Sequence, residues 1–294
     1  MDNKIIDIEN IEEELEQINR DLMLINDRLL ALGMDFNTYF NPKLNLDFIY
    51  ELRDNLMYRI FATNLHFKVL VNHINQIEIS IGDDADSVNI HPLIDKYQQE
   101  IASILDSVVY HSISVYDYLG STINFAIIRQ TRTLKWSSLA KSAKDPLNQI
   151  SKTTISNVIL EVNKTFLDQF YRYRSILIHD KPDFGKSMYN ISIGKSKNAV
   201  QVHFFAGKLL LKSFPKLKEI TNGNENISIR FASFWLMKQN ILTINKLLFG
   251  LKAEIENSYP DVPPLILYLD PITKKQISVS TIYWHEDIFQ NKKM

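Results

Sequence analysis

Residues 170–182 have the sequence FYRYRSILIHDKP. The pattern predicts the last turns of an amphipathic helix, which ends before Pro182 because proline lacks an amide hydrogen and disfavours helical geometry in the preceding residue. Arg172 and His179 are seven residues apart and share one helix face, whereas Arg174 points roughly 140° away from His179 at about 100° per residue. A guanidinium that neutralises phosphoryl oxygens and an imidazole that transfers protons are the groups that a phosphodiester reaction needs.

The order Arg174, polar Ser175, three apolar residues and His179 resembles the R-x4-6-H signature of the HEPN superfamily, in its larger, bacterial, single-chain form. The family usually has Asn, Asp or His at the position of Ser175. The resemblance covers roughly residues 44–258 and implies a mainly α, multi-helix bundle that dimerises through its motif helices. For active members it implies a metal-independent endoribonuclease without a cofactor, which leaves a 2′,3′-cyclic phosphate.

The spacing itself has low specificity. With 7 His residues in the chain, it occurs from Arg59 to His66, from Arg172 to His179 and from Arg174 to His179. No helix stop follows the first pair and no polar residue follows Arg59, so we interpret that pair as an ordinary helix surface.

The chemistry of RNA cleavage suggests catalytic roles for three residues of this motif. Arg174 stabilises the developing charge, His179 acts as acid or base, and Ser175 orients the phosphate or the imidazole. One histidine hardly transfers both protons in a single step, so we expect a second copy of the motif across a symmetric dimer. Further candidates for substrate binding are Arg172, Tyr171, Asp180, Lys181 and Lys186. The competing interpretation of the pair is a surface arginine and a histidine that caps the carboxyl end of a helix.

Composition limits the class of protein. The chain of 294 residues is long enough for a core, and it contains no Cys, which excludes disulfides, thiolate catalysis and cysteine-based zinc sites. The amino-terminal residues lack the features of a signal peptide, and no apolar run reaches the roughly 20 residues of a membrane span, so we expect a cytoplasmic protein with no membrane contact.

Charge is distributed unevenly along the chain. The net charge of −1 argues against a general nucleic-acid coat protein, but residues 181–218 hold eight lysines against Asp183 alone. Beside the motif, this segment is suited to phosphate contacts with RNA, most simply single-stranded RNA, and equally suited to being a solvated surface.

Residues 5–33 predict a helix with apolar residues at steps of three and four, which Gly33 closes. This stripe fits either a coiled coil that forms a homodimer or higher oligomer, or packing on the protein's own body. We therefore divide the chain into the coiled-coil-like helix 1–35, the helical body 44–258 and the extension 259–294.

The rest of the chain alternates helical and strand-like patterns. Further helices are expected at 46–81, 92–128, 134–144, 152–178 and 226–258. Period-two segments predict a β-hairpin insertion near 188–205 and a second hairpin over 265–282, in the carboxyl-terminal extension.

Two classes of function follow. One is a ribonuclease of a defence or toxin type that acts as a dimer and is restrained by a regulatory or antitoxin protein. The other is a catalytically inactive HEPN module that binds RNA, a nucleotide or a partner protein. A purely structural coiled-coil scaffold is a third hypothesis.

Overall fold

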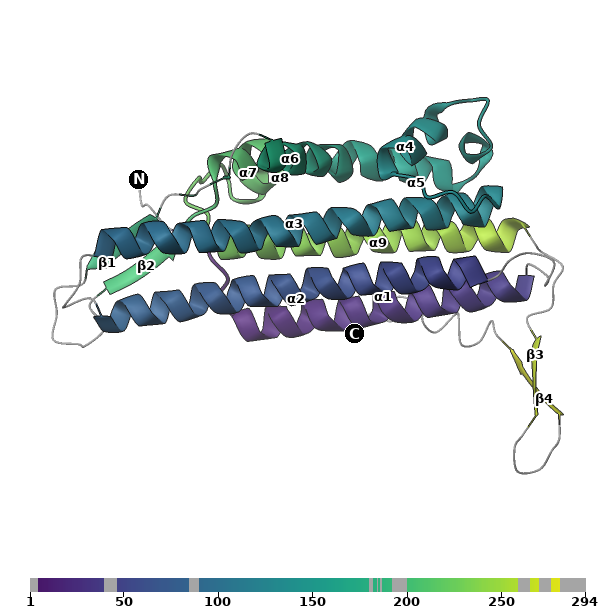
Figure 1. The fold of residues 1–294 in the computed structure, drawn as a ribbon, viewed down its shortest axis with the longest axis horizontal. Helices are drawn as coiled ribbons and strands as arrows, with labels where there is room; N and C mark the ends of the chain where they lie inside the picture. The colour runs from purple at the N-terminus through teal and green to yellow at the C-terminus, as the bar shows by residue number, and fades with distance from the viewer. Residues whose placement is uncertain are drawn as a thin grey trace. The chain divides into compact units, whose positions relative to one another are not determined.

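The computed structural model describes residues 5–39, 47–84, 90–179, 182–183, 185, 187–191, 200–258, 265–269 and 276–280. The protein is mainly helical, as the sequence predicted (Figure 1). The four long helices are α1 (Ile11–Tyr39), α2 (Asp47–Asp84), α3 (Ile90–Ile128) and α9 (Ile229–Ser258). The shorter helices are α4 (Trp136–Lys144), α5 (Ile155–Val162), α6 (Asp168–His179), α7 (Lys208–Ser213) and α8 (Pro215–Ile220).

Both predicted hairpins are present. Strand β1 (Ser187–Ile191) pairs antiparallel with β2 (Val200–Phe204), with Ser187 opposite Phe204. Strand β3 (Leu265–Leu269) pairs antiparallel with β4 (Gln276–Ser280). Each hairpin is a separate two-stranded sheet.

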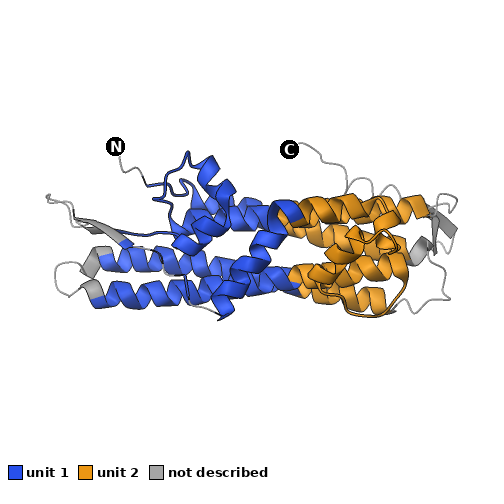
Figure 2. Ribbon diagram, turned by 90° about the horizontal axis from the view of Figure 1, so that it is seen from above, with its two compact units in different colours: residues 1–19, 59–114, 164–240 blue, residues 20–58, 115–163, 241–294 orange. Residues whose placement is uncertain are grey.

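The chain forms two compact units, which Figure 2 shows in different colours. Unit 1 contains residues 1–19, 59–114 and 164–240, and unit 2 contains residues 20–58, 115–163 and 241–294. The segments 1–35, 44–258 and 259–294 predicted from the sequence are successive, whereas each unit combines three separate parts of the chain. The motif region lies entirely within unit 1.

The apolar stripe of α1 is buried inside the protein. Its members from Ile18 to Leu32 are at most 5% exposed: Ile18, Leu22, Ile25, Leu29 and Leu32. The structure therefore agrees with the second interpretation of this stripe, packing on the protein's own body. The predicted helix end at Gly33 is wrong, because α1 continues to Tyr39. Phe36, which lies in this extension, packs against Phe125 of α3 with ring centroids 5.6 Å apart, and this burial stabilises the extra turns.

The expected single helix over 152–178 is divided into several elements. A 3-10 turn, η1 (Ile150–Lys152), precedes α5, and a π-helical turn, η2 (Asn163–Leu167), precedes α6. Thr153 has an extended backbone with φ of −96° and ψ of 157°, which separates η1 from α5. Single π-helical turns are typical interruptions of a longer α-helix.

Helices α7 and α8 were not predicted from the sequence. Each has only six residues, and Pro215 begins α8 at its first position, where a missing amide hydrogen costs nothing. Phe214, between the two helices, has a non-helical backbone, as expected before proline.

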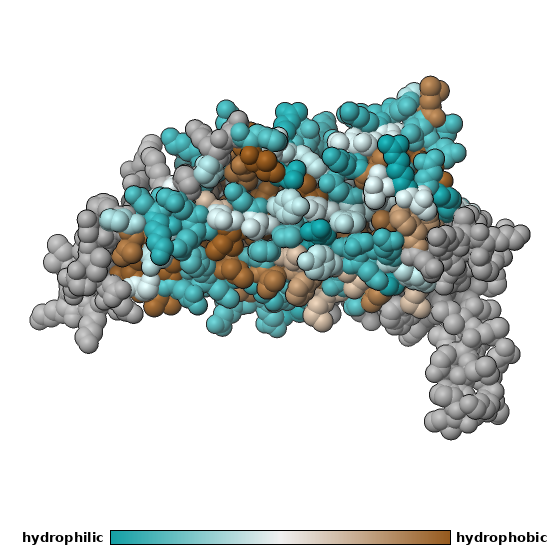
Figure 3. Space-filling view, in the orientation of Figure 1, coloured by the Kyte–Doolittle hydropathy of each residue, from teal (hydrophilic) through white to brown (hydrophobic). Residues whose placement is uncertain are grey.

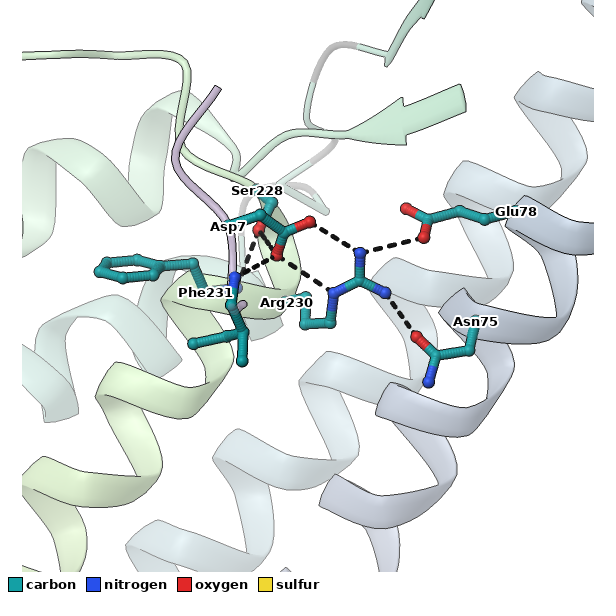
Figure 4. A network of polar contacts seen from close by, with 7 residues as sticks. Asp7, Asn75, Glu78, Ser228, Arg230 and Phe231 are labelled. Atoms are coloured by element: carbon teal, nitrogen blue, oxygen red, sulfur yellow. Dashed lines mark hydrogen bonds and ion pairs between the residues drawn. The ribbon is translucent and has the colours of Figure 1, made fainter. Parts of the chain in front are cut away.

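A buried ion network joins the three segments of unit 1 (Figure 4). Arg230, at the start of α9, donates to Asp7 Oδ2 at 2.7 Å, to Glu78 Oε2 of α2 at 3.0 Å and also to Asn75. Ser228 donates to Asp7 Oδ1 at 2.6 Å. The Arg230 side chain is only 8% exposed, so its charge depends on these partners rather than on water.

The two carboxylates respond differently to this environment. Burial raises the pKa of Glu78, and its contact with Arg230 offsets only part of that effect. Burial acts in the same direction on Asp7, but hydrogen bonds from Arg230 and Ser228 outweigh it and lower the pKa. Asp7 is therefore the more firmly ionised partner of Arg230.

No helix of the described residues is both long and apolar enough to cross a membrane. Figure 3 shows polar side chains over much of the visible face, with apolar ones in separate places. Exposed apolar residues of α2 include Phe61, Leu65 and Val69.

We predict that Arg230→Ala lowers the free energy of unfolding by about 3–5 kcal/mol, because it leaves two carboxylates that are each only 20% exposed without their cation. Denaturant unfolding measured by circular dichroism tests this. The control is Lys238→Ala, which breaks the more exposed pair with Glu14 (2.6 Å) in the same unit and should cost less than about 1 kcal/mol. Equal losses for the two variants would contradict the prediction.

Candidate functional site

Aromatic packing fixes the orientation of α6. Phe166, Phe170 and Tyr173 follow at steps of four and three residues and are all buried. The Phe170 and Tyr173 rings lie 6.1 Å and 5.7 Å from the ring of Phe214, which in turn lies 5.5 Å from Trp235 of α9. One side of α6 is thus held against the core of unit 1.

The motif residues on the remaining sides of α6 differ in their exposure to solvent. Arg174 and Leu177 are half-buried, while Arg172, Ser175 and His179 are exposed. Arg172 forms an ion pair with Asp168 at 2.9 Å, four residues earlier on the same helix. The arginine and the histidine of the R-x4-H motif therefore lie in different environments.

Arg174 lines a pocket of about 320 Å³ between α3 and α6. Its guanidinium carbon lies 5.5 Å from the centre of the Tyr110 ring, within the range of a cation–π contact. Its Nε is buried and has no hydrogen-bond partner in the described part of the chain. The lining residues are Ser103, Asp106, Ser107, Val109, Tyr110 and His111 of α3 with Arg174, Leu177 and Ile178 of α6.

His179 is not among the residues that line this pocket, although it directly follows Ile178, which is. No hydrogen bond or ion pair of His179 is found among the described residues. Tyr171 is half-buried, and its hydroxyl donates a long hydrogen bond of 3.5 Å to the carbonyl of Ile113. The candidates Asp180, Lys181 and Lys186 lie outside the described residues.

His111 of α3, which is not part of the R-x4-6-H motif, brings an imidazole to the pocket. Its ring stacks on His66 of α2 with centroids 4.9 Å apart and an interplanar angle of 14°. Its Nδ1 lies 3.4 Å from a terminal nitrogen of Arg59. A guanidinium can only donate, so Nδ1 accepts, and the proton of the neutral ring is on Nε2.

The environment of His111 favours its neutral form. Burial lowers its pKa, and the nearby His66 and Arg59 lower it further. The interpretation of Arg59 and His66 as an ordinary helix surface missed this contact. A spacing of seven residues does indicate a shared helix face, but nothing in the sequence shows that α3 presents His111 to that face.

Asp106 is the acidic member of the pocket. Burial first, and then the negative charge of Asp183, raise its pKa from 3.8 to about 6. Asp183 accepts hydrogen bonds from the backbone amides of Leu209 (3.0 Å) and Leu210 (2.7 Å) at the start of α7. A Cβ at Gly207 would lie 2.2 Å from the Asp183 carboxyl, so any other residue there would displace this carboxyl from its present position.

Together these residues form a pocket with one cation, one neutral imidazole, two serine hydroxyls and one carboxyl that is easily protonated. Such a set provides several hydrogen-bond donors and a positive charge for an anionic group. Among the described residues, no group of three or more His, Asp or Glu side chains is arranged to hold a metal ion.

Comparison with protein-family models, curated proteins and solved structures found no match.

We predict that Asp106→Asn stabilises the protein in a pH-dependent way. Because the pKa of Asp106 is about 6 in the folded state and 3.8 is its ordinary value, the wild type loses stability as pH rises from about 4 to 6. The variant should match the wild type near pH 4 and exceed it by about 1–3 kcal/mol above pH 6. Thermal unfolding at several pH values measures this. The exposed Asp95→Asn on the same helix is the control, and a gain at pH 4 as large as at pH 7 would contradict the prediction.

Proposed function

We propose that the protein is a HEPN-type ribonuclease that cleaves single-stranded RNA as a homodimer, with Arg174 and His179 as its central residues. The proposed reaction uses the 2′-hydroxyl of the RNA as nucleophile. That oxygen attacks the adjacent phosphorus, the 5′-oxygen leaves with a proton, and a 2′,3′-cyclic phosphate remains. The finer fold assignment, a HEPN-like bundle, is part of the same proposal.

The environment of Arg174 carries this proposal. Its guanidinium faces a concave site, and its buried Nε has no hydrogen-bond partner within the described part of the chain. A buried donor without an acceptor costs about 1–3 kcal/mol, which a bound phosphoryl oxygen would recover. The same contact would strengthen as charge develops on the phosphorane, because hydrogen bonds to charged groups are the stronger ones.

His179 enters the proposal through its exposure. It is the last residue of α6, next to the exposed Ile178, and so can reach a substrate bound outside the pocket that contains Arg174. Facing motif helices in a dimer would bring His179 of one copy toward Arg174 of the other. Ser175, also exposed on α6, is the proposed orienting hydroxyl.

A defence or toxin role, a cytoplasmic location and a regulatory partner belong to this proposal as consequences of the proposed family. A nuclease that acts on cellular RNA must be restrained until it is needed.

A second candidate function is RNA or nucleotide binding without cleavage. One observation favours it: His179 does not line the pocket that contains Arg174. A pocket that has the cation but lacks the motif histidine can bind a phosphate without transferring protons.

The test is cleavage of an end-labelled single-stranded RNA by the full chain in EDTA, with the product ends analysed for cyclic phosphate. We expect His179→Ala and Arg174→Ala each to reduce the rate by about 10²–10⁴-fold, as expected for loss of a proton-transfer group or of the main charge stabiliser. The matched control is Lys164→Ala, which removes an exposed cation near the start of α6 and should leave the rate unchanged.

The outcomes separate the two functions. Cyclic-phosphate products that disappear in both motif variants support the nuclease. RNA binding without cleavage, weakened by Arg174→Ala but not by His179→Ala, supports the binding module. If the wild-type chain neither cleaves nor binds RNA, both functions are rejected.

A further inference from the structure

The structure holds an unassigned cluster beside Arg174, made of Arg59 and His66 on α2 and His111 on α3. His111 contacts both α2 residues and also lines the pocket of Arg174. We propose that His111 and Arg174 form a phosphate-binding subsite within one copy of the chain, with Arg59 and His66 as positioning residues. This inference rests on the proposed function in that the phosphate is taken to be one of an RNA backbone.

The hydrogen bond from Arg59 determines what His111 can offer. Since Arg59 donates to Nδ1, the neutral ring carries its proton on Nε2 and offers a donor at that nitrogen. The parallel stack with His66, at 4.9 Å, restricts rotation of the ring. His111 is therefore a fixed donor toward a phosphoryl oxygen, and in this state it is not a base.

Arg174 supplies the charge of the subsite. The Tyr110 ring lies 5.5 Å from the Arg174 guanidinium carbon and 5.3 Å, centre to centre, from the His111 ring. Both proposed donors thus contact the same aromatic side chain and face the same pocket. Of the two pocket serines, Ser107 donates its hydroxyl hydrogen to the carbonyl of Ser103 at 3.2 Å, and the hydroxyl of Ser103 is an additional donor.

Asp106 opposes the binding of an anion when it is ionised. No ion pair joins it to Arg174 in the described part of the chain, and its pKa of about 6 makes it neutral in mild acid. The other titratable or charged groups around it and His111 are Arg59, His66, Tyr110, Tyr173, Arg174 and Asp183. Phosphate affinity is therefore expected to rise as pH falls from 7.5 to 5.5, and Asp106→Asn should give much of that gain at pH 7.5.

The experiment measures binding of a ten-residue oligothymidylate, which has no 2′-hydroxyl and cannot be cleaved by the proposed reaction. Affinities of the full chain are measured by fluorescence anisotropy, and histidine ring signals are followed by NMR during titration with the same probe. We expect His111→Phe, which keeps a flat ring but removes the donor, to weaken binding by about 10-fold or more. His111→Gln keeps an amide donor and should retain most of the affinity. Lys164→Ala is the control for the loss of a surface cation, and circular dichroism checks folding.

Specific results overturn the inference. These are unchanged affinity in a folded His111→Phe variant, equal loss in His111→Gln and His111→Phe, or no tightening in Asp106→Asn. Failure of the nuclease proposal is a separate result, because the probe reports binding alone. Loss of oligothymidylate binding in His111→Phe supports the subsite even if the wild type never cleaves RNA. If a His111→Phe variant cleaves RNA and binds the probe with unchanged affinity, the nuclease proposal stands and the subsite proposal is rejected.

Discussion

Burial of Phe166 of η2 and of Phe170 and Tyr173 of α6 against Phe214 and Trp235 is the constraint on which the candidate site depends. The side chains of a helix project in fixed directions around its axis. Once Phe166, Phe170 and Tyr173 are packed in the core, the rotation of α6 about its axis is set, and with it the direction in which every other side chain of α6 points. Arg174 then faces α3, and Arg172, Ser175 and His179 are exposed to water. The chemistry available on each side of this helix follows from its packing.

The polar groups around this helix show a second constraint, imposed by burial. Burial raises the pKa of both Asp106 and Asp183, and the negative charge of Asp183 raises the pKa of Asp106 further. Asp183 is held in place by the first amides of α7, which gives this carboxylate a structural role. Asp106 has no such partner among the described residues, and it faces the pocket. The carboxyl that shares the pocket with Arg174 is thus Asp106, while Asp183 is bound to backbone amides.

Much of the helical architecture could be predicted because long apolar periodicities report directly on buried helix faces. The stripe of α1 and both hairpins were recognised from such patterns, whereas the short helices α7 and α8 were not, since six residues contain less than two turns of periodicity. Gly33 was misjudged as a helix end because a local signal was overruled by the burial of Phe36 beyond it.

The site was predicted in part. The sequence marked Arg174 and His179 as motif residues. The approach of Arg59 and His66 to His111 depends on which faces of α2 and α3 meet, and no local pattern encodes that.

The ion network around Arg230 also bears on how the protein is made. Asp7 and Arg230 are 223 residues apart in the chain. At 5–20 residues per second, a ribosome needs roughly ten to forty-five seconds to go from one to the other. During that interval the nascent chain carries Asp7, and for the last 152 residues also Glu78, without the cation that pairs with them. Unit 1 can complete its core only after most of the polypeptide has been synthesised, so its assembly is a late event in translation.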